Sequence, residues 1–135
     1  MGILSLERYK SIVRDIPILT VDGLIVNGKG EYLIVKRKNE PLKGQWWRPG
    51  GRVWKGEKLK DAFTRKMKEE LGTDVKIIHN AGYYEDFYSK SPYGIPIHTV
   101  SIVFLAVISG EIKLDNQSKD YKWSVELPKS LKIIK

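Results

Sequence analysis

A carboxylate on the apolar face of a predicted helix is the first sign of chemistry in this sequence. If the segment 58–71 winds at about 100° per residue, an apolar arc of roughly 140° faces the core. The arc is formed by Leu59, Ala62, Phe63 and Met67. Glu70 falls near the middle of this arc, Glu69 lies at its edge and Arg65 lies just outside it. A buried carboxylate without a partner is strongly unfavourable, so Glu70 requires a cation.

Two kinds of cation fit Glu70. Lys66 lies one turn earlier on the same side of the helix, where it would form an ion pair with Glu70. The alternative is a divalent metal ion. Because the chain has no cysteine, such a metal would be held by oxygen ligands or by the two histidines. The spacing of these two residues alone leaves both readings open.

The glycines and charged residues of this stretch follow a longer pattern. Its fixed positions are Gly51, Glu57, Arg65, Glu69, Glu70 and Gly72. With these residues the sequence resembles the Nudix hydrolases, whose box reads G-x5-E-x7-R-E-U-x-E-E-x-G-U, where U is a bulky aliphatic residue. Lys66 stands where the pattern has a glutamate, and Thr73 replaces the last aliphatic residue.

The resemblance implies an α/β fold, the Nudix-type α/β/α sandwich around a mixed β-sheet, and a Mg²⁺-dependent hydrolase. Members of this family use the carboxylates of the box helix to hold magnesium. A lysine at one of these positions removes ligand charge. We therefore expect a site for one metal ion.

One branch of the family, the GDP-mannose mannosyl hydrolases, lacks the same glutamate and attacks the anomeric carbon of the sugar. The chain is similar to this branch in segments 14–17, 36–37, 44–46, 49–53, 62–65 and 120–123, and at Asp22. The resemblance implies that the Gly50 carbonyl, Glu70 and Gln117 hold the Mg²⁺.

The same resemblance assigns the remaining site residues. Arg37 and Arg52 would bind the diphosphate and stabilise charge on the departing GDP, a role that suits guanidinium groups. Asp22 would help to organise the site, although an acid inside a predicted strand is equally consistent with an ion pair. Arg65 would form pairs within the box.

The general base is the residue that this resemblance does not supply. The mannosyl hydrolases carry a histidine after the glutamine, and this chain has Ser118. Serine does not accept a proton from water near neutral pH without help from another base. The remaining candidates are His79, His98, Glu69, Glu85 and Asp120. A carboxylate base such as Glu69 would return the enzyme to ordinary Nudix chemistry at phosphorus.

Three functions therefore compete. The first is hydrolysis of GDP-mannose, or a related nucleoside diphosphate sugar, to GDP and the free sugar. The second is a Nudix pyrophosphatase that cleaves a nucleoside diphosphate linked to another group. The third is a catalytically weak domain that binds nucleotides. The box carboxylates disfavour the third, because a binding domain has little use for an acid on a core-facing arc.

Several predicted elements must position these residues. A helix is expected over 5–16, with Ser5 as its cap and Pro17 ending it. Strands are expected over 18–26 and 31–37, paired as a hairpin through an Asn-Gly turn, and over 73–84, 98–109 and 121–125. The segments 39–47 and 85–96 have loop composition. Strands on both sides of one long helix predict an α/β domain with a mixed sheet.

Length and composition indicate a single domain over residues 1–135, with 41% hydrophobic and 30% charged residues. No apolar run is long enough to span a membrane, and the N-terminus lacks the features of a secretory signal, so a cytoplasmic protein is expected. The formal net charge of +8 favours an anionic partner. Because dispersed lysines supply most of this charge, nucleic acid is the less favoured partner. The family resemblance suggests a homodimer.

Overall fold

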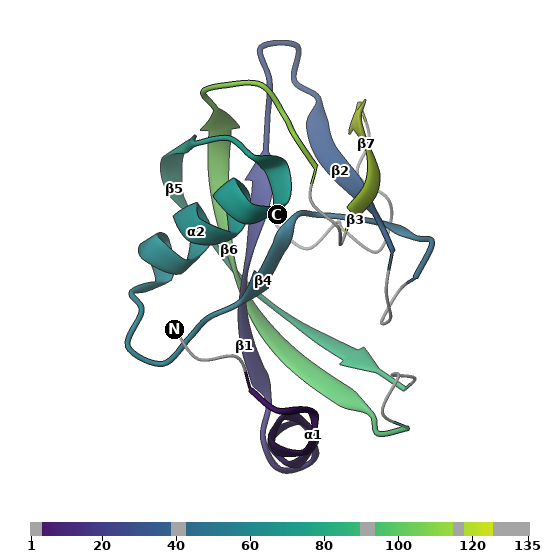
Figure 1. The fold of residues 1–135 in the computed structure, drawn as a ribbon. Coiled ribbons are helices and arrows are strands. Elements are labelled where there is room, and N and C mark those ends of the chain that lie inside the picture. The colour runs from purple at the N-terminus through teal and green to yellow at the C-terminus, as the bar shows by residue number, and fades with distance from the viewer. Residues whose placement is uncertain (1–3, 39–42, 90–93, 115–117, 126–135) are drawn as a thin grey trace.

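The computed structural model describes residues 4–38, 43–89, 94–114 and 118–125, which form two β-sheets and two helices (Figure 1). The four-stranded sheet has the order β4-β1-β6-β5, and the three-stranded sheet has the order β3-β2-β7. The strands are β1 (Ile18–Ile25), β2 (Tyr32–Arg37), β3 (Trp46–Trp47), β4 (Gly50–Arg52), β5 (Val75–Tyr88), β6 (Ile97–Ile108) and β7 (Ser118–Ser124). β1 runs parallel to β6 and antiparallel to β4, so the sheet is mixed, as predicted.

The box helix, α2 (Leu59–Leu71), covers one face of the four-stranded sheet (Figure 1). Phe63 and Met67 are fully buried and pack with Val21 of β1 and Phe104 of β6 in the main core. Gly72 ends the helix in the left-handed conformation, with φ of 67°, which glycine adopts without strain. The predicted apolar arc is therefore the buried side of the helix, and Glu70 lies on that side with 4% exposure.

The first helix, α1 (Leu6–Asp15), begins as predicted. The Ser5 side chain caps it by accepting a hydrogen bond from the Arg8 amide at 3.3 Å. Val13 packs with Ile18 and Ile97 in a second, smaller core at the start of β1. In Figure 1 this helix lies at the far end of β1 from the three-stranded sheet.

Three predictions about the strands need correction. The turn after β1 is present, with the Asn27 side chain accepting from the amides of Lys29 and Glu31, but β1 and β2 belong to different sheets. The backbone joins them through a Val26–Tyr32 bridge and a hydrogen bond from the Asn27 amide to the Glu31 carbonyl. Residues 85–88, expected in a loop, continue β5 to Tyr88, because the long β6 offers backbone partners along this whole length. The expected loop over 39–47 ends in the short strand β3.

Candidate active site

Arg65 holds the charged side of the box together. Its guanidinium donates to both carboxylate oxygens of Glu57, at 2.7 and 2.9 Å, and to both oxygens of Glu69, at 3.2 and 2.9 Å. It also donates to the Arg52 carbonyl at 3.0 Å, which ties α2 to β4. The hydrogen bonds from Arg65 and the Trp54 amide lower the pKa of Glu57. The expected pairing of Arg65 within the box is thus present in the structure.

Glu70 lies against the glycine pair of β4. Its Oε2 accepts a hydrogen bond from the Gly50 amide at 3.2 Å. Gly50 pairs in turn with Asp22 of β1, and a Cβ on Gly50 would overlap Asp22 Oδ1 and the Val21 carbonyl oxygen. The structure therefore brings together three of the residues named for the site, Asp22, Gly50 and Glu70, and only a glycine fits between the two carboxylates.

Lys66 lies over the other glycine of the pair. A Cβ on Gly51 would overlap Lys66 Cε and would lie 3.0 Å from Lys66 Nζ. In the part of the chain that the structure describes, Lys66 is placed beside Gly51 rather than in an ion pair with Glu70. Neighbouring residues of a strand point to opposite faces, so Gly50 faces Asp22 and Gly51 faces Lys66.

Asp22 belongs to a buried ion-pair network, as one of the two sequence-based readings of this acid allowed, but its partner Arg48 was not predicted. Arg48, with 2% exposure, donates from Nε to Asp22 at 2.9 Å and from Nη2 to Asp86 at 3.2 Å. Its guanidinium lies 4.7 Å from the centre of the Trp47 ring and 5.5 Å from that of Tyr84. Arg48 Nη1 is buried without a hydrogen-bond partner among the described residues.

Burial raises the pKa values of the two acids in this network. Loss of hydration raises the pKa of Asp22, and the charge of Arg48 and a hydrogen bond with Ser101 only partly oppose this effect. Loss of hydration likewise raises the pKa of Asp86. Burial and the negative charges of Asp86 and Asp22 raise the pKa of the Tyr88 hydroxyl, so this hydroxyl stays protonated at neutral pH. The network is therefore a set of positioned hydrogen-bonding groups on the sheet face next to Gly50.

The two arginines expected to bind the diphosphate lie on different strands. Arg52 ends β4, and its guanidinium lies 4.4 Å from the centre of the Tyr9 ring and 5.3 Å from that of Trp54. Arg37 ends β2, where its backbone pairs with Ser118 of β7. This pairing places the position that replaces the family histidine directly beside Arg37. Gln117, the third expected metal ligand, lies outside the described residues.

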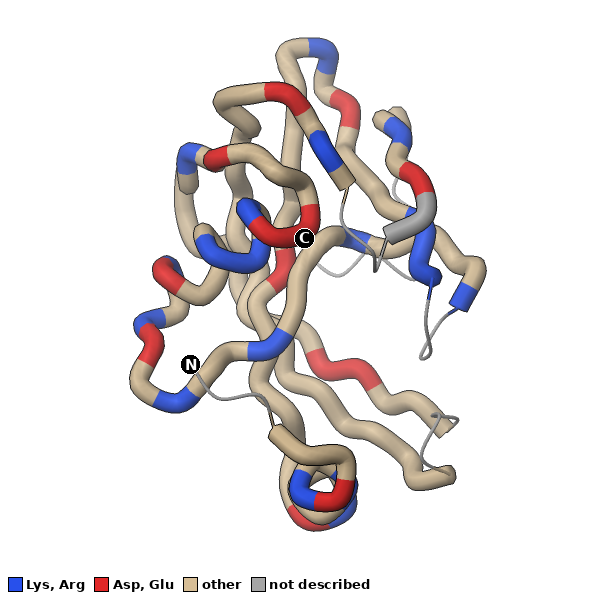
Figure 2. Tube along the Cα trace, viewed as in Figure 1, with Lys and Arg blue, Asp and Glu red and all other residues tan. Residues whose placement is uncertain are grey.

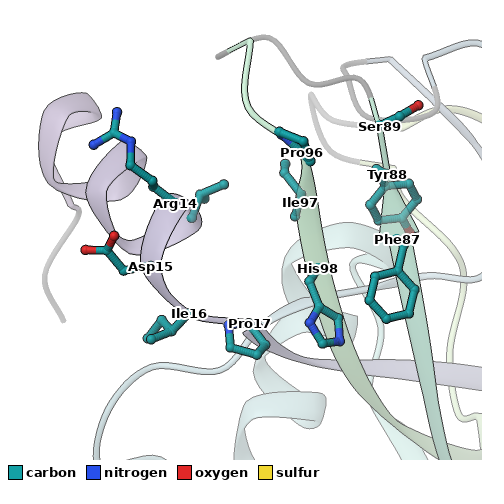
Figure 3. Close-up of a pocket in the computed structure, with 11 residues that line it drawn as sticks. Arg14, Asp15, Ile16, Pro17, Phe87, Tyr88, Ser89, Pro96, Ile97 and His98 are labelled. Atoms are coloured by element: carbon teal, nitrogen blue, oxygen red, sulfur yellow. The ribbon is translucent and has the colours of Figure 1, made fainter.

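Three of the candidate bases, Glu69, His98 and Glu85, have side-chain partners in the structure. Glu69 is bonded to Arg65 and is partly exposed. His98 lies 3.1 Å from a Glu85 oxygen through Nε2, and its ring stacks on Phe87 with centroids 4.2 Å apart. His98 and Phe87 line a pocket of about 500 Å³ between the end of α1 and the paired ends of β5 and β6 (Figure 3). None of the residues found to line this pocket comes from the box.

Among the box carboxylates, Glu70 is the one placed to serve as a magnesium ligand. No three His, Asp or Glu side chains gather into a metal-binding group among the residues that the structure describes. Arg65 engages Glu57 and Glu69, whereas Glu70 is buried against Gly50. Magnesium commonly takes one or two carboxylates from a protein and completes its shell with water and substrate phosphates. The donor set therefore suits one ion that a phosphorylated substrate shares.

Basic residues are spread over several elements and alternate with acids, most densely around α2 (Figure 2). Within the described residues no helix has the length and apolar character needed to cross a membrane. Asp22, Glu70 and Lys66 lie around the glycine pair of β4, where charged side chains meet the backbone of this strand.

Known proteins are similar to this chain in sequence. The model of the NUDIX domain family matches residues 17–128. The low-salt glycan biosynthesis protein Agl8 of Haloferax volcanii is 36% identical over 119 residues, which cover 86% of this chain and 76% of that protein. An ADP-ribose pyrophosphatase of Methanocaldococcus jannaschii is 38% identical over 117 residues, which cover 86% of this chain and 65% of that protein.

Solved structures agree with the sequence matches. A MutT NUDIX hydrolase from Burkholderia pseudomallei superposes with a TM-score of 0.68 and 29% identity, covering 87% of this chain and 91% of that one. A MutT protein from Methanosarcina mazei superposes with a TM-score of 0.69 and 29% identity, covering 82% and 78% of the two chains. The α/β class and the mixed sheet predicted from the sequence are thereby confirmed.

Proposed function

Because the chain belongs to the Nudix hydrolase family, we propose that it hydrolyses a nucleoside diphosphate sugar with the help of one Mg²⁺, and that GDP-mannose is the first substrate to test. The observation that carries this proposal is the pair of side chains at the β4 glycines. Glu70 contacts Gly50, and a lysine lies over Gly51 where the box pattern has a second carboxylate. The relative named for glycan biosynthesis supports a sugar-linked substrate.

The proposed reaction is attack of a water oxygen on the anomeric carbon. The bond between this carbon and the β-phosphate oxygen breaks, and GDP leaves with the electron pair. The Gly50 carbonyl, Glu70 and Gln117 would hold the magnesium, which would supply positive charge to the diphosphate. Arg37 and Arg52 would bind the same phosphates, and Arg65 would keep Glu57 and Glu69 in place.

Asp22 has an indirect role in this proposal. Its carboxylate is bonded to Arg48 and fills the space beside Gly50. It would thereby fix the position of the glycine backbone rather than contact the substrate phosphates. The proton of the attacking water needs an acceptor, and Ser118 is unsuited to that role unless a second base assists it.

A second candidate is cleavage at phosphorus, as in a pyrophosphatase. The 38% identical relative named as an ADP-ribose pyrophosphatase favours it. Glu69, on α2, would then act as the base, and its carboxylate would have to exchange its hydrogen bonds with Arg65 for the attacking water.

Product analysis in water labelled with heavy oxygen separates the two reactions. The purified protein is incubated with Mg²⁺ and GDP-mannose, ADP-ribose or UDP-glucose, and the products are identified by chromatography and mass spectrometry. Attack at carbon gives GDP and labelled mannose, which is the expected result. GMP and mannose phosphate, with the label on a phosphate, would establish the pyrophosphatase instead. No turnover of any of the three would overturn both and favour a nucleotide-binding domain.

A further inference from the structure

The side chain of Lys66 is held in an unusual place for a helix lysine. A solvated lysine extends from its helix into water, but the Lys66 stem lies across Gly51, close enough that a methyl group on this glycine would overlap Cε. Nζ lies 3.0 Å from the same hypothetical methyl position. The side chain is only half-exposed. The ammonium group is therefore placed at the backbone of β4 and not in bulk solvent.

This ammonium group takes part in no hydrogen bond or ion pair with any residue that the structure describes. The neighbouring charges of the box are engaged elsewhere. Arg65 binds Glu57 and Glu69, and Glu70 accepts from the Gly50 amide. A half-buried cation with three unused donors beside a glycine backbone is suited to an anionic ligand.

We propose that Lys66 binds an oxygen of the substrate diphosphate beside Gly51, and so supplies positive charge at a box position where the pattern has a metal-binding carboxylate. This inference rests on the proposed function, because it takes the nucleoside diphosphate as the ligand. It makes Lys66 a substrate-binding residue, and it gives the lysine a role in a box whose other charged positions match the pattern.

The main alternative is a purely electrostatic one, in which Lys66 neutralises Glu70 across one helical turn. The geometry disfavours it, because the Glu70 carboxylate is turned to the Gly50 amide and the Lys66 stem follows Gly51. The two readings differ in a measurable way. An ion pair with Glu70 would stabilise the protein without a ligand, whereas a phosphate contact changes affinity for the ligand.

The first test measures GDP and ADP binding by calorimetry in the presence of a chelator, so that no metal contributes. Lys66→Met keeps the length of the side chain but removes the charge, and Lys66→Arg keeps the charge. Lys60→Met is the matched control, because Lys60 is an exposed lysine of the same helix. We expect Lys66→Met to weaken binding about tenfold or more, and Lys66→Arg and Lys60→Met to stay within about threefold of wild type.

The outcomes distinguish this inference from the proposed function. If neither nucleotide binds the wild-type protein, or if Lys66→Met binds as tightly as wild type, the role of Lys66 is wrong. A protein that hydrolyses GDP-mannose with an unchanged kcat/KM after Lys66→Met would keep the proposed function and lose this inference. A protein that binds GDP through Lys66 but turns over no sugar nucleotide would keep this inference and lose the proposed function.

A second test uses Lys66→Glu, which restores the glutamate that the box pattern has at this position. Bound Mn²⁺ is counted by electron paramagnetic resonance in the presence of GDP. We expect the number of ions bound per chain to rise from one to two, because the ammonium group is replaced by an oxygen ligand. An unchanged count, together with unchanged GDP affinity, would show that the Lys66 position does not face the phosphate site.

Discussion

At the scale of single residues, the box divides its carboxylates between two tasks. Glu57 and Glu69 are bonded to one guanidinium, that of Arg65, and this group also holds the Arg52 carbonyl. Glu70 is buried at the other side of the helix and contacts the Gly50 amide. Glu57 and Glu69 therefore have a structural role, whereas the position of Glu70 suits a metal ligand.

Glu70→Gln tests this division. Glutamine can still accept the hydrogen bond from the Gly50 amide, so the free energy of unfolding should change by less than about 1 kcal/mol. Loss of the ligand charge should lower magnesium-dependent turnover at least about a hundredfold. Turnover and urea unfolding are measured beside Glu111→Gln, an exposed control. Retained activity would move the metal away from Glu70.

The pH dependence of stability should have opposite signs at two acids. Burial raises the pKa of Asp86 above 3.8, so the folded protein retains a proton that the unfolded chain has released, and this contribution destabilises the fold as pH rises through that window. The hydrogen bond from Arg65 lowers the pKa of Glu57 below 4.5, so its contribution is present above that value and is lost as pH falls through the lowered pKa.

These signs are tested by measuring the free energy of unfolding from pH 3 to 7 for wild type, Asp86→Asn and Glu57→Gln. The stability of wild type relative to Asp86→Asn should decrease with rising pH above about 4, and that of wild type relative to Glu57→Gln should increase with rising pH below about 5. Slopes of the same sign would show that one of the two environments is misassigned.

At the scale of elements, the glycine pair of β4 is the junction between helix and sheet. Gly50 contacts the β1 side through Asp22, and Gly51 contacts the α2 side through Lys66. The atoms next to the two glycines differ in how far they can move. The Val21 carbonyl belongs to the central strand of the fold, whereas the end of Lys66 is flexible.

Alanine at these two glycines should therefore have different effects. Gly50→Ala forces a methyl group against backbone and should lower the free energy of unfolding by about 3 kcal/mol. Gly51→Ala should cost less than about 1 kcal/mol, because only the lysine end must move, but it should weaken GDP binding as Lys66→Met does. Thermal unfolding and calorimetry check the pair. Equal losses of stability would contradict the assigned neighbours.

The sequence predicted the elements with strong local signals and missed those that depend on a distant partner. Helical periodicity located α2 and the burial of Glu70, because both follow from positions a few residues apart. The extension of β5 to Tyr88 depends on backbone partners in β6, and the loop-like composition of 85–96 concealed it. Asp86 was missed for this reason. Arg48 precedes Pro49 in a segment that the sequence analysis singled out, but its role follows only from its contacts with Asp22 and Asp86, which the sequence does not show.

At the scale of the whole molecule, the site is assembled from strands of the four-stranded sheet and from helix α2, which are distant from one another in the sequence. β1 supplies Asp22, β4 the glycine pair, and α2 Glu70 and Lys66. β5 contributes Asp86 through its bond with Arg48. The chain as a whole carries a net charge of +8, and its lysines and arginines are spread over several elements, which favours attraction of a small anion.

The parallel pairing of β1 with β6 has a consequence for how the protein folds. Thr20 pairs with Ser101, so the two central strands meet only after the chain between them has closed into a large loop. Such high contact order slows folding to about milliseconds to seconds. Stopped-flow refolding should show α2 gaining helical circular dichroism before the central sheet forms, and nucleotide affinity should appear only with the later phase. The reverse order would mean that strand pairing nucleates the fold. The catalytic groups thus exist as a unit only in the fully folded chain, so a truncated or still-growing chain that ends before β6 would carry the whole box and yet have no working site.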